Sequence, residues 1–420
     1  MNSGLSYINS FSHSGKAVKD LSRARALMSA LGDPQNALRF IHIAGTNGKG
    51  SISQMLSEIC IDAGLRTGLF TSPYIFRYND RIKINGKEIP DDELDRLAEH
   101  VKAAISSLPC KDELSQFEIT MAVAFLYFKE KQCDIVILEA GLGGLLDCTN
   151  IIENPLACVI GSVSFDHTQI LGETLTEIAC QKAGIIKKGR PCILSAGAAA
   201  EVIRVFREKA DKENSPLIIP NGKLEVLNSS LFGSDIIYNN EQYHIAMQGE
   251  HMVRNALSVI ECMAAIGRKP GIGTENVKNG LAKACVPARV QVLSEKPLFI
   301  IDGAHNEDSM RALAKTVKAA GKRPVNAVIG MCRDKNMRSA VKELTGVVDR
   351  FYTCDGFDDR AENAASLAEI IKELGGDAEA CDLPALEKAR KLMEQMPDSL
   401  TLICGSLYLC SKALTDAGKV

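Results

Sequence analysis

The sequence has little net charge, no paired cysteine motif and no long hydrophobic run. Its 49 lysines and arginines nearly balance 52 aspartates and glutamates, which leaves no electrostatic signature of binding to nucleic acid or an anionic membrane. The 14 cysteines include no C-x-x-C pair and are scattered through apolar segments. This pattern favours buried thiols in a reducing compartment over a disulfide or metal framework. The longest apolar stretch, MAVAFLYF at residues 121–128, is too short to span a membrane.

The amino-terminal segment also lacks a targeting signal. Residues 1–20 contain no apolar stretch of the signal-peptide type, so we expect a cytoplasmic protein with neither membrane nor nucleic-acid partners. With 46% hydrophobic and 24% charged residues, no fixed repeat and no low-complexity segment, the composition is that of a globular protein. A length of 420 residues exceeds the size at which one core usually stops growing, so we expect two domains.

Short apolar runs alternate with amphipathic stretches along most of the chain, which is typical of α/β units on a mostly parallel sheet. We predict an N-terminal P-loop-type ATPase domain over residues 1–287. Residues 288–420 are predicted to form a smaller, doubly wound, Rossmann-like domain, with the joint near Pro287. Residues 222–247 alternate polar and apolar side chains around Asn and Gly turns, and we expect them to form small β hairpins appended to the first domain.

The segment HIAGTNGKGS, residues 42–51, lies between an apolar strand and a helical pattern. Its glycines let backbone N–H groups approach an anion, and the following helix contributes its positive end. Lys49 can contact phosphate oxygens and Ser51 can ligate magnesium. The common G-x-x-x-x-G-K-[ST] spacing is absent, because Ile43 occupies the position of the first glycine. On this segment alone, a glycine-rich turn with a solvated lysine is an equally good interpretation.

Polar side chains follow three other apolar strands. Glu139 ends DIVILE, Asp166 and His167 follow ACVIGSV, and Asp302 with His305 follows PLFII. Ligands of open α/β sheets bind at the carboxyl ends of strands, and an acid there suits magnesium facing phosphates. Salt-bridged carboxylates, a helix cap and structural histidines are the simpler alternatives.

Six segments occur in a characteristic order: HIAGTNGKGS, FTSPYIFRYNDRIKING, EAGLGGLLDCTN, FDHTQILGETLTEIACQKAGIIK, DGAHN and GSLYL. Their order and spacing resemble folylpolyglutamate synthase and dihydrofolate synthase, a family within the Mur ligase superfamily. The resemblance runs from LGDPQ at residue 31 to GSLYL at residues 405–409. In this superfamily a short G-T-N-G-K-[GT]-[ST] loop replaces the common spacing.

The resemblance implies roles for individual residues. ATP is expected to be held by Asn47, Gly48, Lys49, Gly50, Ser51, Asn255, Arg289 and Asp302. Magnesium ligands are expected to be Ser51, Ser72, Glu139, His167 and a carbamylated Lys182. Catalytic roles are expected for Lys49, Lys182, Asp302 and His305, the last of these near the reacting phosphate. Substrate contacts are expected from Arg81, Asp147, Thr149, Asn150 and Ser406.

Two positions depart from the family pattern. Leu145 stands where bacterial members often have arginine, and Asn336 stands where an acid is usual in the segment that also contains Asp334 and Lys335. Arg289, at the predicted joint between the domains, is expected to help clamp the nucleotide so that domain closure excludes water.

The implied activity is ATP-dependent amide formation. Phosphorylation of a carboxylate gives an acyl phosphate that an amine can attack, and such a step needs positioning and charge neutralisation more than covalent help from the protein. The expected substrates are ATP, L-glutamate and either dihydropteroate or a reduced folate, with Mg²⁺ and K⁺ as cofactors and a monomeric enzyme. A cell-wall amino-acid ligase of the same superfamily and a nucleotide-dependent switch are the alternatives.

Overall fold

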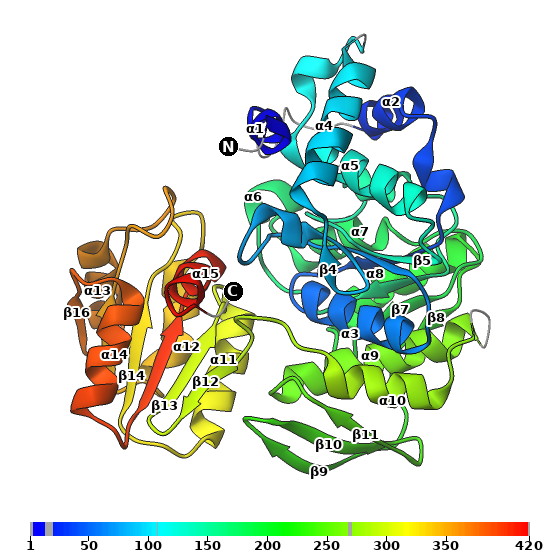
Figure 1. Ribbon diagram of the computed structural model, residues 1–420. Helices are drawn as coiled ribbons and strands as arrows, with labels where there is room; N and C mark the ends of the chain where they lie inside the picture. Colours follow the sequence, from blue (N-terminus) through cyan, green and yellow to red (C-terminus); the bar gives the residue numbers. More distant parts are fainter. Residues whose placement is uncertain (1–2, 13–19, 107, 268–270, 419–420) are drawn as a thin grey trace. The chain divides into compact units, whose positions relative to one another are not determined.

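The computed structural model describes residues 3–12, 20–106, 108–267 and 271–418, which group into two units (Figure 1). The first unit contains the chain up to Lys223 together with Arg254–Ala284. The second contains Leu224–Val253 and the chain from Cys285 onward. Within the described part of the chain, no helix combines the length and apolar composition that crossing a membrane requires.

The first unit is built on an eight-stranded sheet with the order β4-β3-β2-β5-β1-β6-β7-β8. The strands from β2 to β8 in this order are parallel, and β3 and β4 extend one edge as antiparallel strands. The strands are β1 (Phe40–Ala44), β2 (Thr67–Phe70), β3 (Ile82–Ile84), β4 (Lys87–Glu88), β5 (Ile135–Glu139), β6 (Ala157–Ile160), β7 (Cys192–Leu194) and β8 (Leu217–Ile218). The central strands are buried along their whole length, which explains their continuous apolar runs.

Helices cover this sheet and connect its strands. The helices are α1 (Ser3–Asn9), α2 (Ser22–Ala30), α3 (Lys49–Asp62), α4 (Asp91–Ile105), α5 (Gln116–Glu130), α6 (Thr168–Leu171), α7 (Leu175–Ala183), α8 (Ala200–Lys212), α9 (Glu250–Ile266) and α10 (Thr274–Lys283). Short 3₁₀ turns are η1 (Pro34–Ala37), η2 (Tyr78–Arg81), η3 (Lys111–Glu113) and η4 (Cys148–Ile151). On one face of the sheet, α2, α4 and α5 form a core with β1, β2 and β5, while α7 and α8 pack over β6 and β7.

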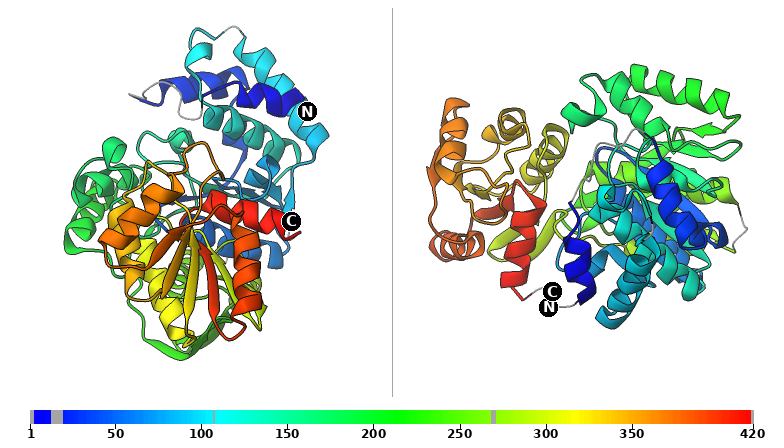
Figure 2. Two further views of the ribbon diagram at one scale, coloured as in Figure 1. Left: turned by 90° about the vertical axis from the view of Figure 1, so that its left-hand side faces the viewer. Right: turned by 90° about the horizontal axis from the view of Figure 1, so that it is seen from above.

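The second unit contains a six-stranded sheet with the order β12-β13-β17-β14-β15-β16, parallel except for β12. Helices α11, α12 and α13 pack on one face, and Figure 2 shows further helices on the opposite side of these strands. The strands are β12 (Gln291–Glu295), β13 (Leu298–Asp302), β14 (Val325–Ile329), β15 (Arg350–Thr353), β16 (Ala378–Ala380) and β17 (Leu400–Cys404). The helices are α11 (Glu307–Ala319), α12 (Met337–Thr345), α13 (Ala364–Glu373), α14 (Ala385–Gln395) and α15 (Leu407–Asp416). The predicted doubly wound architecture is confirmed.

The predicted hairpins form a separate three-stranded antiparallel sheet of β9 (Leu224–Ser230), β10 (Gly233–Tyr238) and β11 (Glu241–Ile245). By its contacts this sheet groups with the second unit, whereas the sequence pattern places it with the first domain. Leu231 packs against the core of that unit, and Glu250 forms an ion pair with Lys315. The second boundary falls after Ala284, three residues before the predicted joint at Pro287.

Candidate active site

The glycine-rich segment forms a tight loop between β1 and α3. Gly45 and Gly48 have positive φ angles of 150° and 88°, and α3 begins at Lys49. The loop is tied to the segment after β6, because the Thr46 backbone N–H donates to the Ser162 carbonyl oxygen at 2.6 Å. The Thr46 hydroxyl also donates to the Ser164 carbonyl oxygen at 3.0 Å. This places the backbone N–H groups of the loop and the N-terminus of α3 at the carboxyl edge of the sheet, as the sequence predicts.

Asn255 on α9 lies directly beside this loop. A Cβ atom on Gly48 would come within 2.7 Å of the Asn255 Oδ1 atom. Gly48 is therefore required both by its left-handed backbone and by the amide side chain next to it. Of the predicted nucleotide-binding residues outside the loop, Asn255 is the one that the first unit brings into contact with it.

Lys49 folds back over its own loop. Its Nζ atom donates to the carbonyl oxygens of Gly45 at 3.0 Å and Thr46 at 3.3 Å. These bonds hold the ammonium group above the loop that leads into α3. Ser51, in the first turn of α3, is buried.

Glu139, the last residue of β5, is the acid beside the loop. It is 3% exposed, and its Oε2 atom lies 3.8 Å from the position of a Cβ on Gly50. The same oxygen accepts the Ser72 backbone N–H at 3.3 Å. One carboxylate, two serines and a phosphate-binding loop thus converge from three strands, and hard oxygen donors of this kind fit magnesium. Among the described residues no group of three or more His, Cys, Asp or Glu side chains has metal-binding geometry.

His167 lies at the end of the segment that follows β6. It adopts a left-handed conformation with φ of 49° and precedes α6, and its backbone N–H donates to Asp166 Oδ1 at 2.9 Å. Its Nε2 atom is 3.8 Å from the same oxygen. The His167 imidazole is exposed, and a nitrogen donor is unusual for magnesium, so its role as a ligand rests mainly on the family resemblance.

Lys182 on α7 is a buried amine. Only 2% of it is exposed, and burial lowers its pKa to about 7, with the positive charge of Lys49 acting in the same direction. Asp166 opposes this shift. The pKa shift shows that Lys49, Asp166 and Lys182 share one electrostatic environment, although they lie on separate segments of the sequence.

Asp147, Thr149 and Asn150 organise the loop after β5. The Asp147 carboxylate accepts the backbone N–H groups of Leu142 at 2.8 Å and Thr149 at 3.0 Å, and burial raises its pKa. Asn150 donates to the carbonyl oxygens of Leu145 and Gly184 at 3.0 and 3.1 Å. These residues therefore fix the glycine-rich segment against the end of α7, while the Leu145 side chain is 42% exposed.

His42 was not singled out from the sequence, although it begins the segment that revealed the loop. It is fully buried in β1, its Nε2 atom lies 2.9 Å from Thr149 Oγ1, and that hydroxyl donates to Asp147 at 2.5 Å. Burial, with a contribution from Lys187, lowers the pKa of His42 to about 3. The sequence signal that could have revealed these hydrogen bonds is a single polar residue, His42, inside the apolar strand FIHIA.

In the second unit, Asp302 holds the segment that contains Arg289. Its carboxylate accepts the backbone N–H groups of Val290 at 2.7 Å and Ala304 at 2.8 Å. Ala288 and Val290, on either side of Arg289, have positive φ angles of 56° and 44°. Because left-handed backbone is unfavourable for such residues, the Asp302 contacts stabilise an otherwise strained turn.

The remaining predicted residues of the second unit lie at helix starts. His305 precedes α11, and its Nδ1 atom is 2.9 Å from the Gly303 carbonyl oxygen. Ser406 caps α15 by accepting the Tyr408 N–H at 3.1 Å. Asn336 caps α12 by accepting the Ser339 N–H at 3.3 Å, so this departure from the family pattern keeps an N-cap side chain.

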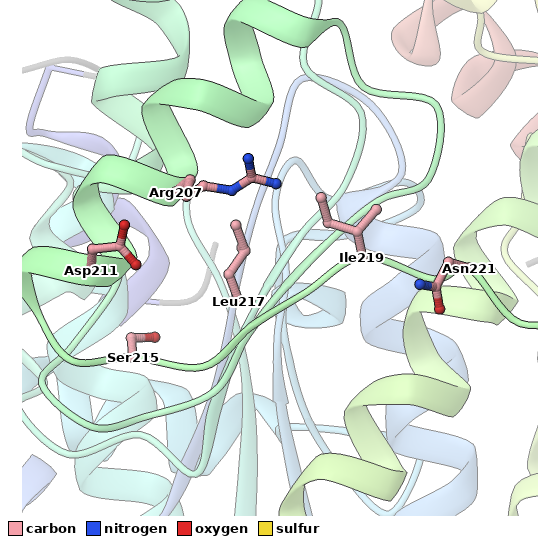
Figure 3. A pocket seen from close by; sticks show the side chains of 6 residues that line it. All are labelled: Arg207, Asp211, Ser215, Leu217, Ile219 and Asn221. Atoms are coloured by element: carbon pink, nitrogen blue, oxygen red, sulfur yellow. The ribbon is translucent and has the colours of Figure 1, made fainter.

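A pocket of about 410 Å³ lies elsewhere in the first unit, beside α8 and β8. Figure 3 shows the side chains that line it: Arg207, Asp211, Ser215, Leu217, Ile219 and Asn221. None of the predicted site residues is among them. The phosphate-binding loop and Glu139 therefore define the candidate active site independently of this pocket.

Two family models match the chain. Residues 43–263 match the Mur ligase middle domain, and residues 288–407 match the Mur ligase glutamate ligase domain. The dihydrofolate synthase/folylpolyglutamate synthase of Bacillus subtilis is 34% identical over 93% of both chains. The folylpolyglutamate synthase of Lacticaseibacillus casei is 32% identical over 97% of this chain and 96% of its own.

Solved structures give the same result. The folylpolyglutamate synthase of Mycobacterium tuberculosis, complexed with ADP and AMPPCP, has a TM-score of 0.87 with 27% identity over 96% of each chain. Escherichia coli FolC in complex with DHPP and ADP has a TM-score of 0.86 with 28% identity, over 100% of this chain and 98% of its own.

Fold, loop and family models together define the protein as a Mur ligase, an ATP-dependent enzyme that forms an amide bond. Within this class, the chain belongs to the folylpolyglutamate synthase and dihydrofolate synthase family. Both the family and the enzyme class predicted from the sequence are confirmed, which decides against the nucleotide-dependent switch.

Proposed function

We propose that this ligase couples L-glutamate to dihydropteroate and to the γ-carboxylate of a tetrahydrofolate. The observation that carries the proposal is the convergence of the phosphate-binding loop, Glu139 and Ser72 at one sheet edge, in a chain of this family. Full-length relatives named for both activities support assigning both acceptors.

In the first step, a carboxylate oxygen of the acceptor attacks the γ-phosphorus of ATP, the bond to the β-phosphate oxygen breaks, and ADP leaves. Backbone N–H groups of residues 47–51 and the Lys49 ammonium group stabilise the charge on the transferred phosphoryl group. Bound magnesium, held by Ser51, Ser72, Glu139 and His167, would neutralise phosphate charge in this step. Asn255 beside the loop, with Arg289 and Asp302, is assigned to nucleotide binding.

In the second step, the amine of L-glutamate attacks the acyl carbon, and phosphate leaves with the electrons of its bond to that carbon. The attacking amine must be neutral, so its proton has to be accepted. Donation from His305 Nδ1–H to Gly303 oxygen at 2.9 Å leaves Nε2 as the basic nitrogen of the neutral imidazole, which suits this role. Asp147, Thr149, Asn150, Arg81 and Ser406 are assigned to substrate binding.

Lys182 is proposed to be carbamylated. The neutral form of an amine is the one that attacks CO₂, and burial of Lys182 favours that form. Carbamylation replaces a buried cation beside Lys49 with an anion. A carbamate signal from Lys182 after exposure to ¹³C-labelled CO₂, absent in Lys182→Gln, would support this assignment, and the same spectrum from both proteins would contradict it.

The cellular setting is proposed to be the cytoplasm. All fourteen cysteines are free thiols, and ten of them are buried, as expected in a reducing compartment. A K⁺ requirement and a monomeric state stay predictions from the family resemblance. Turnover with K⁺ replaced by Na⁺ tests the first, and light scattering of the purified protein tests the second.

The experiment that tests the function is ATP-dependent phosphate release with magnesium and L-glutamate in the presence of dihydropteroate, tetrahydrofolate or neither. Release should depend on an acceptor. Equal release with and without acceptors would contradict the assignment.

A further inference from the structure

His42 is a fully buried histidine that neither of the proposed reaction steps uses. It lies at the centre of β1, in register with Leu138 on β5 and Cys158 on β6, and it is 0% exposed. Its Nε2 atom lies 2.9 Å from Thr149 Oγ1, and its Nδ1 atom has no hydrogen-bond partner among the described residues. Burying a polar ring costs free energy unless it is hydrogen-bonded, so the contact with Thr149 is the feature that needs an explanation.

The direction of this contact follows from the single hydrogen of the Thr149 hydroxyl. That hydroxyl donates to Asp147 Oδ1 at 2.5 Å, so its oxygen is left to accept from His42. We therefore assign the hydrogen of the His42 ring to Nε2, which leaves Nδ1 as the bare nitrogen. Burial and the charge of Lys187 lower the pKa of His42 to about 3, so the ring is neutral near pH 7 and this tautomer persists.

The hydrogen bonds that start at His42 end on Asp147, which organises the loop after β5. The Asp147 carboxylate is buried and accepts the backbone N–H groups of Leu142 at 2.8 Å and Thr149 at 3.0 Å. Gly141 adds a further backbone hydrogen bond to it. One carboxylate thus holds both the beginning and the end of this loop.

His42 also lies between the two strands that carry the proposed chemistry. β1 continues beyond it into the phosphate-binding loop, and β5 ends at Glu139 and continues into the loop after β5. Backbone pairing joins the two strands as far as Glu139, which is in register with Ile43. Beyond that point, the contact of the His42 side chain with Thr149 continues the connection between β1 and the loop.

We propose that His42 is a positioning residue, whose Nε2–H holds Thr149 and, through it, Asp147, so that the loop after β5 keeps the shape in which it binds the acid substrate. This inference rests on the proposed function and deepens it, because that function places substrate contacts on the loop without naming what orients them. A hydrogen bond in a water-free core is strong and directional, which suits it to selecting one arrangement of the loop.

The test uses two substitutions that place an amide at different distances along the position of the imidazole. Counted in bonds from Cγ, the amide nitrogen of glutamine corresponds to Nε2 and that of asparagine to Nδ1. His42→Gln can therefore still donate to Thr149, whereas His42→Asn is too short to do so.

Thr149→Val removes the other partner of the hydrogen bond and keeps the shape of the side chain. Thr401→Val is its matched control. Thr401 lies in β17 and is 0% exposed, as Thr149 is, and its Oγ1 atom has no hydrogen-bond partner among the described residues. The two substitutions thus remove the same buried hydroxyl, one of them with partners and the other without.

Rates of the full-length proteins are measured with dihydropteroate and with tetrahydrofolate, and KM for ATP is measured in parallel. For His42→Asn and Thr149→Val we expect kcat/KM for the acid substrates to fall about tenfold, the size typical of a lost buried hydrogen bond, with KM for ATP unchanged. His42→Gln should recover most of this loss, and Thr401→Val should behave as the wild-type protein. Adding His42→Asn to Thr149→Val should cause little further loss, because the contact is already absent.

Equal kcat/KM values for His42→Gln and His42→Asn would overturn the inference, because only the longer amide reaches Thr149. A matching rise in KM for ATP would also overturn it, because that result indicates a general disturbance of β1. If His42→Asn does not fold, Thr149→Val decides the question, and a value equal to that of Thr401→Val would overturn the inference. Failure of the wild-type protein to glutamylate either acceptor would instead refute the proposed function, and the inference with it.

Discussion

Replacing Gly48 with alanine tests whether the loop and Asn255 act together. The substitution forces a Cβ atom onto a residue with φ of 88° and within 2.7 Å of Asn255 Oδ1. Left-handed backbone costs a non-glycine residue about 1–2 kcal/mol. The clashing atom is the end of a side chain, so Asn255 moves away and loses its contacts, at a further cost of about 1 kcal/mol. The expected total is about 2–3 kcal/mol of unfolding free energy.

Gly64→Ala provides the matched control. Gly64 also has a positive φ, 77°, but a Cβ there meets nothing within 4 Å. It should therefore show only the backbone cost of about 1–2 kcal/mol. Urea unfolding of both variants, with and without ATP, separates the backbone cost from the cost of displacing Asn255.

Gly48→Ala should be the less stable variant and should lose the stabilisation that ATP confers, while Gly64→Ala keeps it. Adding Asn255→Ala to Gly48→Ala should remove the clash and so recover the part of the unfolding free energy that the clash costs. Equal stability of the two glycine variants, with ATP stabilising both, would refute the reasoning.

Three other changes have defined outcomes. Lys49→Met should reduce kcat roughly 100-fold or more with little change in unfolding free energy, measured by phosphate release and urea unfolding, because its charge acts on the phosphoryl group. Glu139→Gln should raise the magnesium concentration for half-maximal activity by about tenfold or more, measured by metal titration, and an unchanged titration would remove Glu139 from the ligand set. His42 has a folded pKa of about 3, below its ordinary 6.5, so the unfolded chain binds the extra proton and stability falls as the pH drops from 6.5 toward 3. At pH 4.5 the loss is on the order of 3 kcal/mol, and His42→Asn should lack this part of the pH dependence when unfolding is measured at pH 7 and 4.5.

The sequence predicted best where the relevant residues are adjacent along the chain. The strand, loop and helix around Lys49 follow from local periodicity and glycine placement, as do the carboxyl-edge positions of Glu139 and Asp302. Contacts between distant segments could not be derived in this way. Asn255 lies about 200 residues beyond Gly48, so its place beside the loop came from family resemblance alone.

Other features depended on packing. The hairpins form over residues 224–245 as predicted, but strand periodicity carries no information about the packing of Leu231 against the core of the second unit. The role of His42 was also missed. It fills a core position of β1, and its hydrogen-bond partner Thr149 is far away in the sequence. The stack of Arg81 on Tyr74 and Tyr78 requires the geometry of the turn, which no spacing rule supplies.

The most direct test of the central claim is the mass of the product formed from ATP, L-glutamate and magnesium with dihydropteroate or tetrahydrofolate. The account predicts that dihydropteroate gains one glutamate and that tetrahydrofolate gains at least one, each addition matched by one phosphate released. Phosphate release without any gain in acceptor mass would contradict the claim that this site activates a folate-type carboxylate.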